Sequence, residues 1–411
     1  MQRQTGQTSK TPNQPLIIGG GHSGLLLALA LHRSGLPSTI IDADPADQVL
    51  KAPFDGRALA LMQGSKRVFD ALDLWPEFET IATPIYSVKV QDTGTGGLIT
   101  YDACDVGDDA FGYGMETRRL RTRLLELVQA CPEIRYFGHT RLDRLSREPD
   151  AVTAHLSDGQ CLRTQLLIGA DGRRSSVRDF AGIRTNQVSY DQIAITLAFR
   201  HEKPHDHRVR EYMNEAGPLA LLPIGEQICS ATWIERPSDA EKLLNTSPAR
   251  QLKALSDRQN SELGPLEILG EPKGFPLTAS MAKRYVAPRV ALVGDAAHGL
   301  HPIHAQGWNL GVRDVAALTE ILVDAARAQQ DPGGGDVLQR YARWRSGDAH
   351  LILSLTDGLN RLFSTDFVPA KLLRRTSLTV LDRIAPLKTW VMRRGMGMSG
   401  NLPKLARGLT L

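Results

Sequence analysis

The feature that most constrains this chain is a strand–glycine–helix–strand pattern near its start. An apolar run at 16–18 enters Gly19-x-Gly21-x-x-Gly24, an apolar helix follows, and a β-branched strand then ends at Asp42. Such glycines allow a tight turn, a close approach to a pyrophosphate and close helix packing, and the helix start offers free N–H groups. The acid that ends the next strand accepts hydrogen bonds from ribose hydroxyls. An ordinary glycine-rich loop would not explain that acid, so the pattern predicts a dinucleotide site.

Two later segments repeat the theme of a strand that ends in an acid. Apolar strands run into Gly169-Ala170-Asp171-Gly172 and into Gly294-Asp295, and a glycine-rich helix start follows the second at about Gln306. A strand-end acid can bond a ligand hydroxyl, and a helix start aims N–H groups at an anion or carbonyl. The Asp171 segment alone would be read as an ordinary turn, but three such acids in one chain predict one shared site. The helix-start candidates are Gly307, Trp308, Asn309 and Leu310.

The order of these motifs predicts an α/β fold in which a Rossmann-like nucleotide-binding domain is interrupted twice. Alternating and hairpin-like stretches separate the motifs, and we assign them to a β-sheet substrate domain. The expected ranges are a disordered leader at 1–14, a nucleotide-binding domain at 15–84, 105–187 and 278–345, a substrate domain at 85–104 and 188–277, and a C-terminal helical basic segment at 346–411.

Several function classes are disfavoured by composition. The four cysteines lie far apart without a Cys-x-x-Cys pair, so neither a zinc site nor a disulfide framework is indicated. The N-terminus is polar and lacks the apolar core of a signal peptide, and the longest apolar run near it is far shorter than the ~20 residues that span a bilayer. We expect a cytoplasmic protein without a metal.

Positive charge is concentrated at the C-terminal end. Residues 361–411 hold ten Lys or Arg against two Asp, whereas the preceding chain is about neutral. No nucleic-acid motif accompanies this charge, so an anionic membrane surface is the better partner. Residues 368–391 combine leucines with basic residues, which is typical of an interfacial helix. A helix packed on the core with a solvated basic face is the alternative, and both remain open.

The three motifs, in this order and over nearly the whole chain, resemble the FAD-dependent aromatic hydroxylases related to p-hydroxybenzoate hydroxylase. The resemblance implies their fold, with FAD as cofactor and NAD(P)H as co-substrate. It also implies that Asp42 holds the adenosine ribose and Asp295 the ribityl chain, and that Asp171 and Gly172 lie near the pyrophosphate. Arg57, in the Asp-Gly-Arg segment after the second strand, and Arg118, which opens the returning helix, match positions that contact FAD in relatives.

Within that family the chain is most similar to the polyprenylphenol hydroxylases of ubiquinone biosynthesis. The resemblance lies in segments 55–61, 356–363, 392–397 and 402–405. One departure is the pair His304-Ala305, where relatives have Ala-Gly before Gln-Gly. If position 305 requires a positive φ, alanine costs about 1 kcal/mol there.

The resemblance also implies the chemistry. NAD(P)H reduces FAD, oxygen adds at flavin C4a, and the resulting hydroperoxyflavin delivers oxygen to the ring of a prenylated phenol. The flavin performs the difficult steps, so no catalytic triad or metal is needed. We expect the backbone N–H groups around Gly307 and Asn309 to stabilise negative charge at flavin N1–C2=O, and Pro302 to shape the neighbouring wall.

Other functions remain open at this point. The same fold could hydroxylate a small soluble aromatic acid, or the chain could be a non-catalytic FAD-binding scaffold of a biosynthetic complex. If the substrate is a prenylated phenol, the enzyme must meet the inner face of a membrane or an associated complex. The basic C-terminal segment is then the expected peripheral contact.

The fingerprint generates a first prediction: the purified protein should be yellow and should release FAD rather than FMN. The reason is that Asp42 and the glycine loop would recognise an adenosine half that FMN lacks. Chromatography of the flavin released on denaturation measures this. Release of FMN alone would contradict the assignment of the loop.

Overall fold

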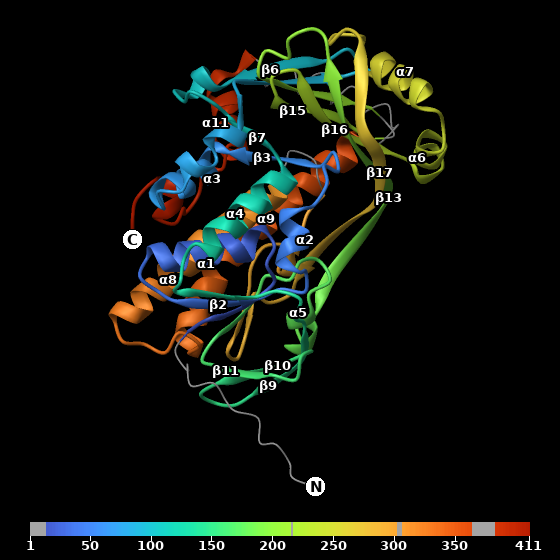
Figure 1. Ribbon diagram of the computed structural model, residues 1–411. Helices are drawn as coiled ribbons and strands as arrows, with labels where there is room; N and C mark the ends of the chain where they lie inside the picture. Colours follow the sequence, from blue (N-terminus) through green and yellow to red (C-terminus); the bar gives the residue numbers. More distant parts are fainter. Residues whose placement is uncertain (1–13, 215–216, 302–305, 364–382) are drawn as a thin grey trace.

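The computed structural model describes residues 14–214, 217–301, 306–363 and 383–411. Most of the leader expected at 1–14 lies outside these ranges. In Figure 1 the described chain forms two halves, with a six-stranded sheet and its covering helices below and an eight-stranded sheet above.

The lower half is built on a sheet of short, buried strands. Its order is β18 (Val286–Ala287), β19 (Val290–Leu292), β12 (Leu167–Gly169), β1 (Leu16–Ile18), β2 (Ser38–Ile41) and β8 (Ile134–Phe137). All pairs are parallel except β18 with β19. Every residue of β1, β2 and β12 is buried, as expected of a parallel sheet covered on both faces. The strands predicted around 16–18, 38–41, 166–169 and 290–292 are confirmed.

Helices and a small antiparallel sheet cover the parallel sheet. The helix α1 (His22–Arg33) packs against α4 (Thr117–Gln129) and α8 (Gln306–Arg327), and α8 packs against α9 (Gly335–Phe363). Figure 1 shows these helices together on one side, with the three-stranded sheet below them. That sheet contains β9 (Leu142–Arg147), β10 (Val152–Leu156) and β11 (Cys161–Thr164). The predicted helix from Thr117 and the helix start at Gln306 are both confirmed.

The upper half is a mixed sheet with its own core. Its order is β20 (His298–Gly299), β17 (Leu266–Ala282), β13 (Thr185–His201), β16 (Ile228–Glu235), β15 (Leu219–Gly225), β14 (Arg208–Met213), β5 (Ser87–Asp92) and β6 (Leu98–Asp102). The hairpin-like stretch at 85–104 therefore contains β5 and β6, and it joins this sheet through β14. Two short helices, α6 (Pro237–Leu244) and α7 (Pro248–Arg258), lie within the stretch at 188–277 that we assigned to the β-sheet substrate domain.

Two long strands and a third sheet connect the halves. Strands β13 and β17 have seventeen residues each and run side by side from the upper sheet toward the lower half, as Figure 1 shows. The third sheet has the order β3 (Ala58–Met62), β7 (Gly112–Glu116) and β4 (Thr83–Ile85). A Cβ at Gly114 would collide with the carbonyl of Pro223, so glycine lets this sheet pack closely on β15.

The remaining elements are short helices and the C-terminal part of the chain. They are α2 (Ala46–Leu50), α3 (Gln63–Ala71), α5 (Ser176–Phe180), α11 (Ala385–Gly395) and the 3-10 turns η1 (Trp75–Glu77), η2 (Glu79–Ile81), η3 (Ala103–Val106), η4 (Gly294–Ala296) and η6 (Leu405–Arg407). Helix α9 runs without a break through residues 345 and 346, where the expected nucleotide-binding domain ends and the expected C-terminal segment begins. Among the described residues no helix is long and apolar enough to span a membrane. Residues 368–382, which are most of the stretch at 368–391, lie outside the described residues.

A buried ion cluster links α8, α9 and the turn after β19. The fully buried carboxylate of Asp314 accepts a hydrogen bond from the backbone N–H of Gly294 at 3.0 Å and from Arg345 Nε at 2.7 Å, and His298 Nε2 lies 2.5 Å from its Oδ2. Arg345 also donates to Asp348 at 2.9 Å. Burial alone would raise the pKa of Asp314, but the neighbouring His298 and Arg345 outweigh it and hold that pKa below its usual range.

This cluster predicts a large stability loss on Arg345→Met. The substitution would remove one of the cations that pair with the fully buried Asp314 and should lower the free energy of unfolding by about 3–5 kcal/mol. Arg343→Met is the matched control, because Arg343 is exposed on the same helix and, within the described residues, donates to the backbone of Gln339; it should change stability by less than about 0.5 kcal/mol. Urea unfolding compares the three proteins, and equal midpoints would contradict the proposed importance of the cluster.

Candidate functional site: a flavin-binding edge

The glycine loop after β1 is closed toward the protein and open on its other side. Gly19 has φ +111°, and a Cβ there would lie 2.5 Å from the carbonyl oxygen of Ala170. A Cβ at Gly24 would collide with the carbonyl of Gly19, whereas one at Gly21 would meet no heavy atom within 4 Å. Gly21 is also the N-cap of α1, and no side chain caps it. The open side therefore presents free backbone N–H groups at a helix start, which is the arrangement that binds a pyrophosphate.

Asp42 ends β2 beside this loop and is 6% exposed. Its Oδ2 accepts hydrogen bonds from Arg121 Nη2 at 2.9 Å and from the Tyr136 hydroxyl at 3.1 Å. Arg121 also donates to the carbonyl of Gly20 at 3.0 Å and to Asp44 at 2.8 Å. Arg121 is not among the residues predicted from the sequence, although it follows Arg118 by three residues and so lies one helical turn further along α4. Arg121 fixes the orientation of Asp42 and ties it to the glycine loop.

The two predicted arginines, Arg57 and Arg118, are partly exposed and pair with acids close to them in the sequence. Arg57 precedes β3, is half-exposed and pairs with Asp55 at 2.6 Å. Arg118, at the start of α4, donates to the carbonyl of Ala52 at 3.3 Å and to Glu116 at 3.2 Å. The Nε of Arg118 is buried and has no hydrogen-bond partner among the residues that the structure describes. Buried donors are normally satisfied, so this atom suits an oxygen acceptor on a bound ligand.

The Asp-Gly motif after β12 forms a tight turn. Asp171 accepts hydrogen bonds from the Ser175 hydroxyl at 2.5 Å, the Ser176 hydroxyl at 2.9 Å and the backbone N–H of Val177 at 3.0 Å, so it stabilises the start of α5. Gly172 has φ +78°, and a Cβ there would meet nothing within 4 Å. The carboxylate of Asp171 thus bonds to residues of its own turn, while the space beside the backbone of Gly172 is unfilled.

An ion pair joins this turn to the Gly-Asp motif after β19. Arg173 Nε donates to Asp295 at 3.1 Å, and its two terminal nitrogens donate to the carbonyls of Thr278 and Leu300 at 3.0 and 2.8 Å. The carboxylate of Asp295 is 41% exposed. Because β1, β2, β12 and β19 are parallel, their carboxyl ends meet at one edge of the sheet. The structure therefore brings the three strand-end acids to the same edge, as the sequence analysis expected.

The start of α8 faces this edge. A Cβ at Gly307 would meet no heavy atom within 4 Å, so the backbone there is open. Trp308 is partly exposed, its ring centroid lies 5.4 Å from that of His22, and its buried indole N–H has no partner in the described part of the chain. His22 Nε2 lies 2.9 Å from the carbonyl of Thr117, and burial lowers the pKa of His22 to about 4. The imidazole beside the helix start is therefore neutral near pH 7.

Asn309 and Leu310 hold the helix start in place. Asn309 is fully buried, its side-chain oxygen accepts from the backbone N–H of Met62 at 2.8 Å, and its amide nitrogen donates to the carbonyl of Ala60 at 2.8 Å. Leu310 is fully buried in the main core. The side chain of Asn309 thus ties α8 to β3. The predicted Pro302 and the pair His304-Ala305 lie outside the described residues.

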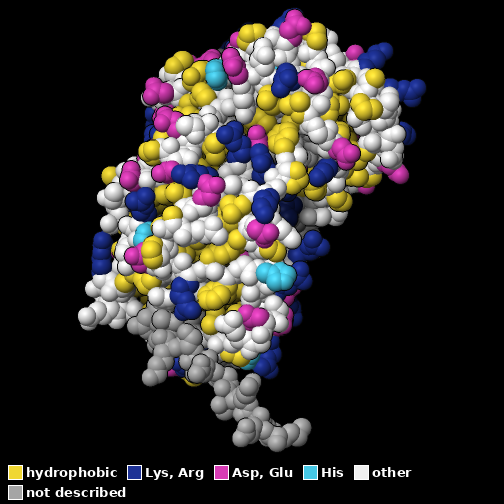
Figure 2. Space-filling view, in the orientation of Figure 1, with side chains coloured by type: hydrophobic (Ala, Val, Ile, Leu, Met, Phe, Trp, Pro, Cys, Tyr) yellow, Lys and Arg dark blue, Asp and Glu magenta, His cyan; other side chains and the backbone are white. Residues whose placement is uncertain are grey.

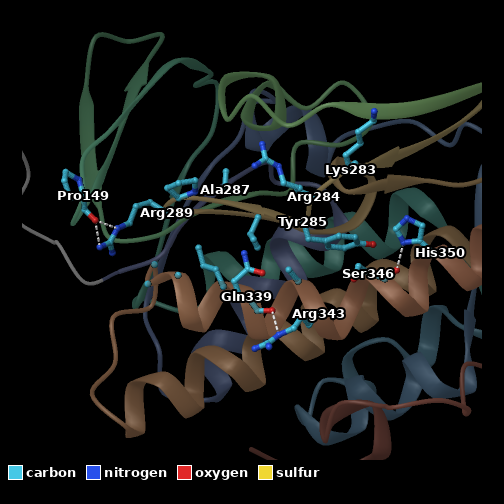
Figure 3. Close-up of a pocket in the computed structure, with 18 residues that line it drawn as sticks. Pro149, Lys283, Arg284, Tyr285, Ala287, Arg289, Gln339, Arg343, Ser346 and His350 are labelled. Carbon is cyan, nitrogen blue, oxygen red and sulfur yellow. Dashed lines mark hydrogen bonds between the residues drawn. The ribbon is translucent and has the colours of Figure 1, made fainter.

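A separate surface cavity of about 520 Å³ lies between α9 and the segment that leads into β18. Figure 3 shows Arg289 turned toward Pro149 and Arg343 turned back toward Gln339, away from the hollow beside Tyr285. None of the lining residues belongs to the three strand-end motifs. We therefore place the functional site at the sheet edge and assign no role to this cavity.

The face shown in Figure 2 is consistent with that placement. Lys and Arg side chains gather near the middle of the face, between the two halves, beside exposed hydrophobic side chains. The residues at the sheet edge fit FAD in three respects: the backbone is open at Gly21 and Gly307, the buried Nε of Arg118 has no partner among the described residues, and Asp42 and Asp295 follow strands that end at the same edge of the sheet. The fold and this edge define a dinucleotide-binding flavoprotein.

Comparison with known proteins identifies the family. The profile of the family described as FAD binding domain matches residues 13–354. The chain is 39% identical to the ubiquinone hydroxylase UbiL of Rhodospirillum rubrum, over 99% of this chain and 95% of the relative. It is 31% identical to the 3-demethoxyubiquinol 3-hydroxylase of Escherichia coli, over 94% and 99% of the two chains.

Solved structures agree on the fold. The p-nitrophenol 4-monooxygenase PnpA of Pseudomonas putida superposes with a TM-score of 0.78 at 18% identity, covering 95% of this chain and 99% of that one. The chain therefore belongs to the FAD binding domain family. It is an FAD-dependent monooxygenase of the aromatic hydroxylase class and has the p-hydroxybenzoate hydroxylase fold.

The exposed carboxylate at the end of β19 generates a prediction for Asp295→Ala. The substitution should remove an acceptor for a flavin hydroxyl and leave Arg173 Nε unpaired, so FAD should bind about 10- to 100-fold more weakly. Flavin retained after ultrafiltration measures the loss. Asp158→Ala, in an exposed hairpin turn, is the control and should keep its flavin. Full FAD occupancy in Asp295→Ala would remove Asp295 from the ribityl role.

Proposed function

We propose that this chain hydroxylates the aromatic ring of a polyprenylphenol intermediate of ubiquinone biosynthesis, using NAD(P)H and O2. The observation that carries the proposal is the 39% identity to a ubiquinone hydroxylase over almost the full length of both chains. The E. coli relative, a 3-demethoxyubiquinol 3-hydroxylase, supports the same substrate class.

The residues at the sheet edge would each hold one part of the cofactor. Asp42 would accept from the adenosine ribose, and Asp295 would bond the ribityl chain. The loop at Gly21 and the turn at Gly172 would leave room for the pyrophosphate. Bound FAD supplies the redox chemistry, and the protein supplies binding, orientation and exclusion of water.

The start of α8 would stabilise charge on the flavin ring. Its first backbone N–H groups have no partner within the helix, and the helix dipole adds positive potential there. These groups would stabilise negative charge at flavin N1–C2=O. Asn309 would act as a positioning residue, because its two hydrogen bonds to β3 hold the helix start in place.

The substrate class determines where in the cell the enzyme meets its substrate. A polyprenyl chain partitions into lipid, so the enzyme must meet its substrate at a membrane surface or within a biosynthetic complex. We propose a cytoplasmic protein with peripheral contact at the inner face of the membrane. The basic C-terminal segment supports this contact through its charge, since each Lys or Arg near an anionic surface contributes about 1 kcal/mol.

A substrate comparison tests the proposal. A short-chain prenylphenol in detergent should stimulate NAD(P)H oxidation and yield a product one oxygen heavier, because the prenyl group adds apolar contacts that a small acid lacks. The ratio kcat/KM should exceed that for 4-hydroxybenzoate by at least about tenfold. Product mass and NAD(P)H consumption provide the measurement.

Preference for the small acid would instead favour a hydroxylase of soluble aromatics. Stimulation by neither compound would favour a non-catalytic FAD-binding scaffold. Quinone profiling in a deletion strain then identifies the ring position, because the accumulating intermediate lacks the missing hydroxyl group.

A further inference from the structure

Helix α11 carries a row of large apolar side chains on its outside. Ile384, Leu387 and Trp390 are 46%, 42% and 53% exposed. Leu387 and Trp390 lie about one turn apart on the same side of α11, and Ile384 precedes Leu387 by the same interval as the N-cap residue of the helix. We call these three residues the α11 apolar face. Isolated exposed hydrophobic residues are normal on a protein surface, but three within seven positions form a patch that needs an explanation.

The opposite side of α11 is firmly attached to the protein. Met392 and Met396 are 2% and 0% exposed and belong to a core cluster that also contains Phe111. Lys388 Nζ lies 3.8 Å from Asp105 in η3 and 5.9 Å from the ring centroid of Tyr101 in β6. In Figure 1 α11 accordingly lies near β6, the edge strand of the eight-stranded sheet. The apolar face is thus presented outward by a helix that is anchored on its other side.

The charge around this face favours one kind of partner. From residue 383 to 411 the chain has six Lys or Arg and no Asp or Glu. Arg383 and Arg393, which flank the apolar face, are exposed. The acid in neighbouring η3, Asp105, faces Lys388 on the attached side. Apolar side chains with a tryptophan, bordered by arginines, are the composition that lies in the interface of an anionic bilayer.

We propose that the α11 apolar face docks on the surface of an anionic lipid bilayer. Ile384, Leu387 and Trp390 would enter the interfacial region, and Arg383 and Arg393 would meet lipid phosphates. The functional reason for such docking rests on the proposed polyprenylphenol substrate. The surface itself rests on the exposure and charge of α11.

The far end of α11 touches the start of the flavin-facing helix. The carbonyl of Gly395, the last residue of α11, accepts a hydrogen bond from Gln306 Nε2 at 3.0 Å, and Gln306 is the first residue of α8. The carbonyl of Met396 accepts from the backbone N–H of Gly64 at 2.8 Å. Trp390 precedes Gly395 by five residues, which is an axial rise of about 7–8 Å. Docking would therefore bring the start of α8 close to the lipid surface, so the ring could reach the flavin while the polyprenyl tail stays in the bilayer.

Vesicle binding tests the proposal on the full-length, FAD-loaded protein. Sedimentation with phosphatidylcholine vesicles, with and without phosphatidylglycerol, is compared for the wild type, for Leu387→Ser/Trp390→Ser and for Phe180→Ser. Phe180 is the matched control, because it is 40% exposed in α5, far along the chain from the basic segment. Retained flavin absorbance shows that each variant is folded.

The expected result is binding to the anionic vesicles that weakens with added salt and falls at least about tenfold in the double variant but not in Phe180→Ser. The tryptophan emission of the wild type should shift to shorter wavelength on binding, and Trp390→Phe should lose most of that shift while still binding.

Equal binding by the wild type and the double variant, or no binding to anionic vesicles, would overturn the proposal; the second result would leave a protein partner to cover α11. The assay involves no turnover. Docking can therefore be confirmed even if the polyprenylphenol is not hydroxylated. An active enzyme that does not bind vesicles would refute docking and leave the proposed function standing.

Discussion

The buried carboxylate of Asp314 is the interaction on which the flavin edge depends most. A charge removed from water is tolerated only when partners satisfy it, and Asp314 has partners from three directions. One is the backbone N–H of Gly294, one is His298, and one is Arg345 of α9. Through these bonds the turn that presents Asp295, the strand that follows it and the two long helices are fixed relative to one another. The turn that carries the exposed acid Asp295 is thus held in place by a buried acid, Asp314.

At Asp42 and at the start of α8, too, a neighbouring side chain holds the site in position. Arg121 holds Asp42 against the glycine loop, and Asn309 holds α8 against β3. Arg121 comes from α4, far along the chain from Asp42, whereas Asn309 belongs to the helix start itself and reaches across to β3. A cofactor edge assembled from four segments needs such cross-links, because each segment alone is a strand followed by a turn. The geometry of the edge therefore depends on residues outside the fingerprint motifs as well as on residues within them.

The sequence predicted what local patterns encode. Apolar strands bounded by glycine and acid specify β1, β2, β12 and β19, and the helix starts at Thr117 and Gln306 were also found. Helices α6 and α7 were missed, although each begins with proline at its first position, a known helix-start signal. The partners of Asp42, Asp295 and Asp314 could not be predicted, because they lie 16 to 122 positions away and meet only after folding.

The contacts of Gly395 and Met396 also affect the order in which the enzyme can be completed. Gln306 and Gly64 can bond to residues 395 and 396 only after residue 396 has left the ribosome. By then the strands of the parallel sheet and the glycine loop have long been available to fold. Domains generally begin to fold during synthesis, from the N-terminus onward. The nascent chain can therefore form the adenosine end of the site early, but the ring end gains its last supports late. Flavin capture would then begin at the adenine and finish at the isoalloxazine, with the C-terminal helix closing the sequence of events.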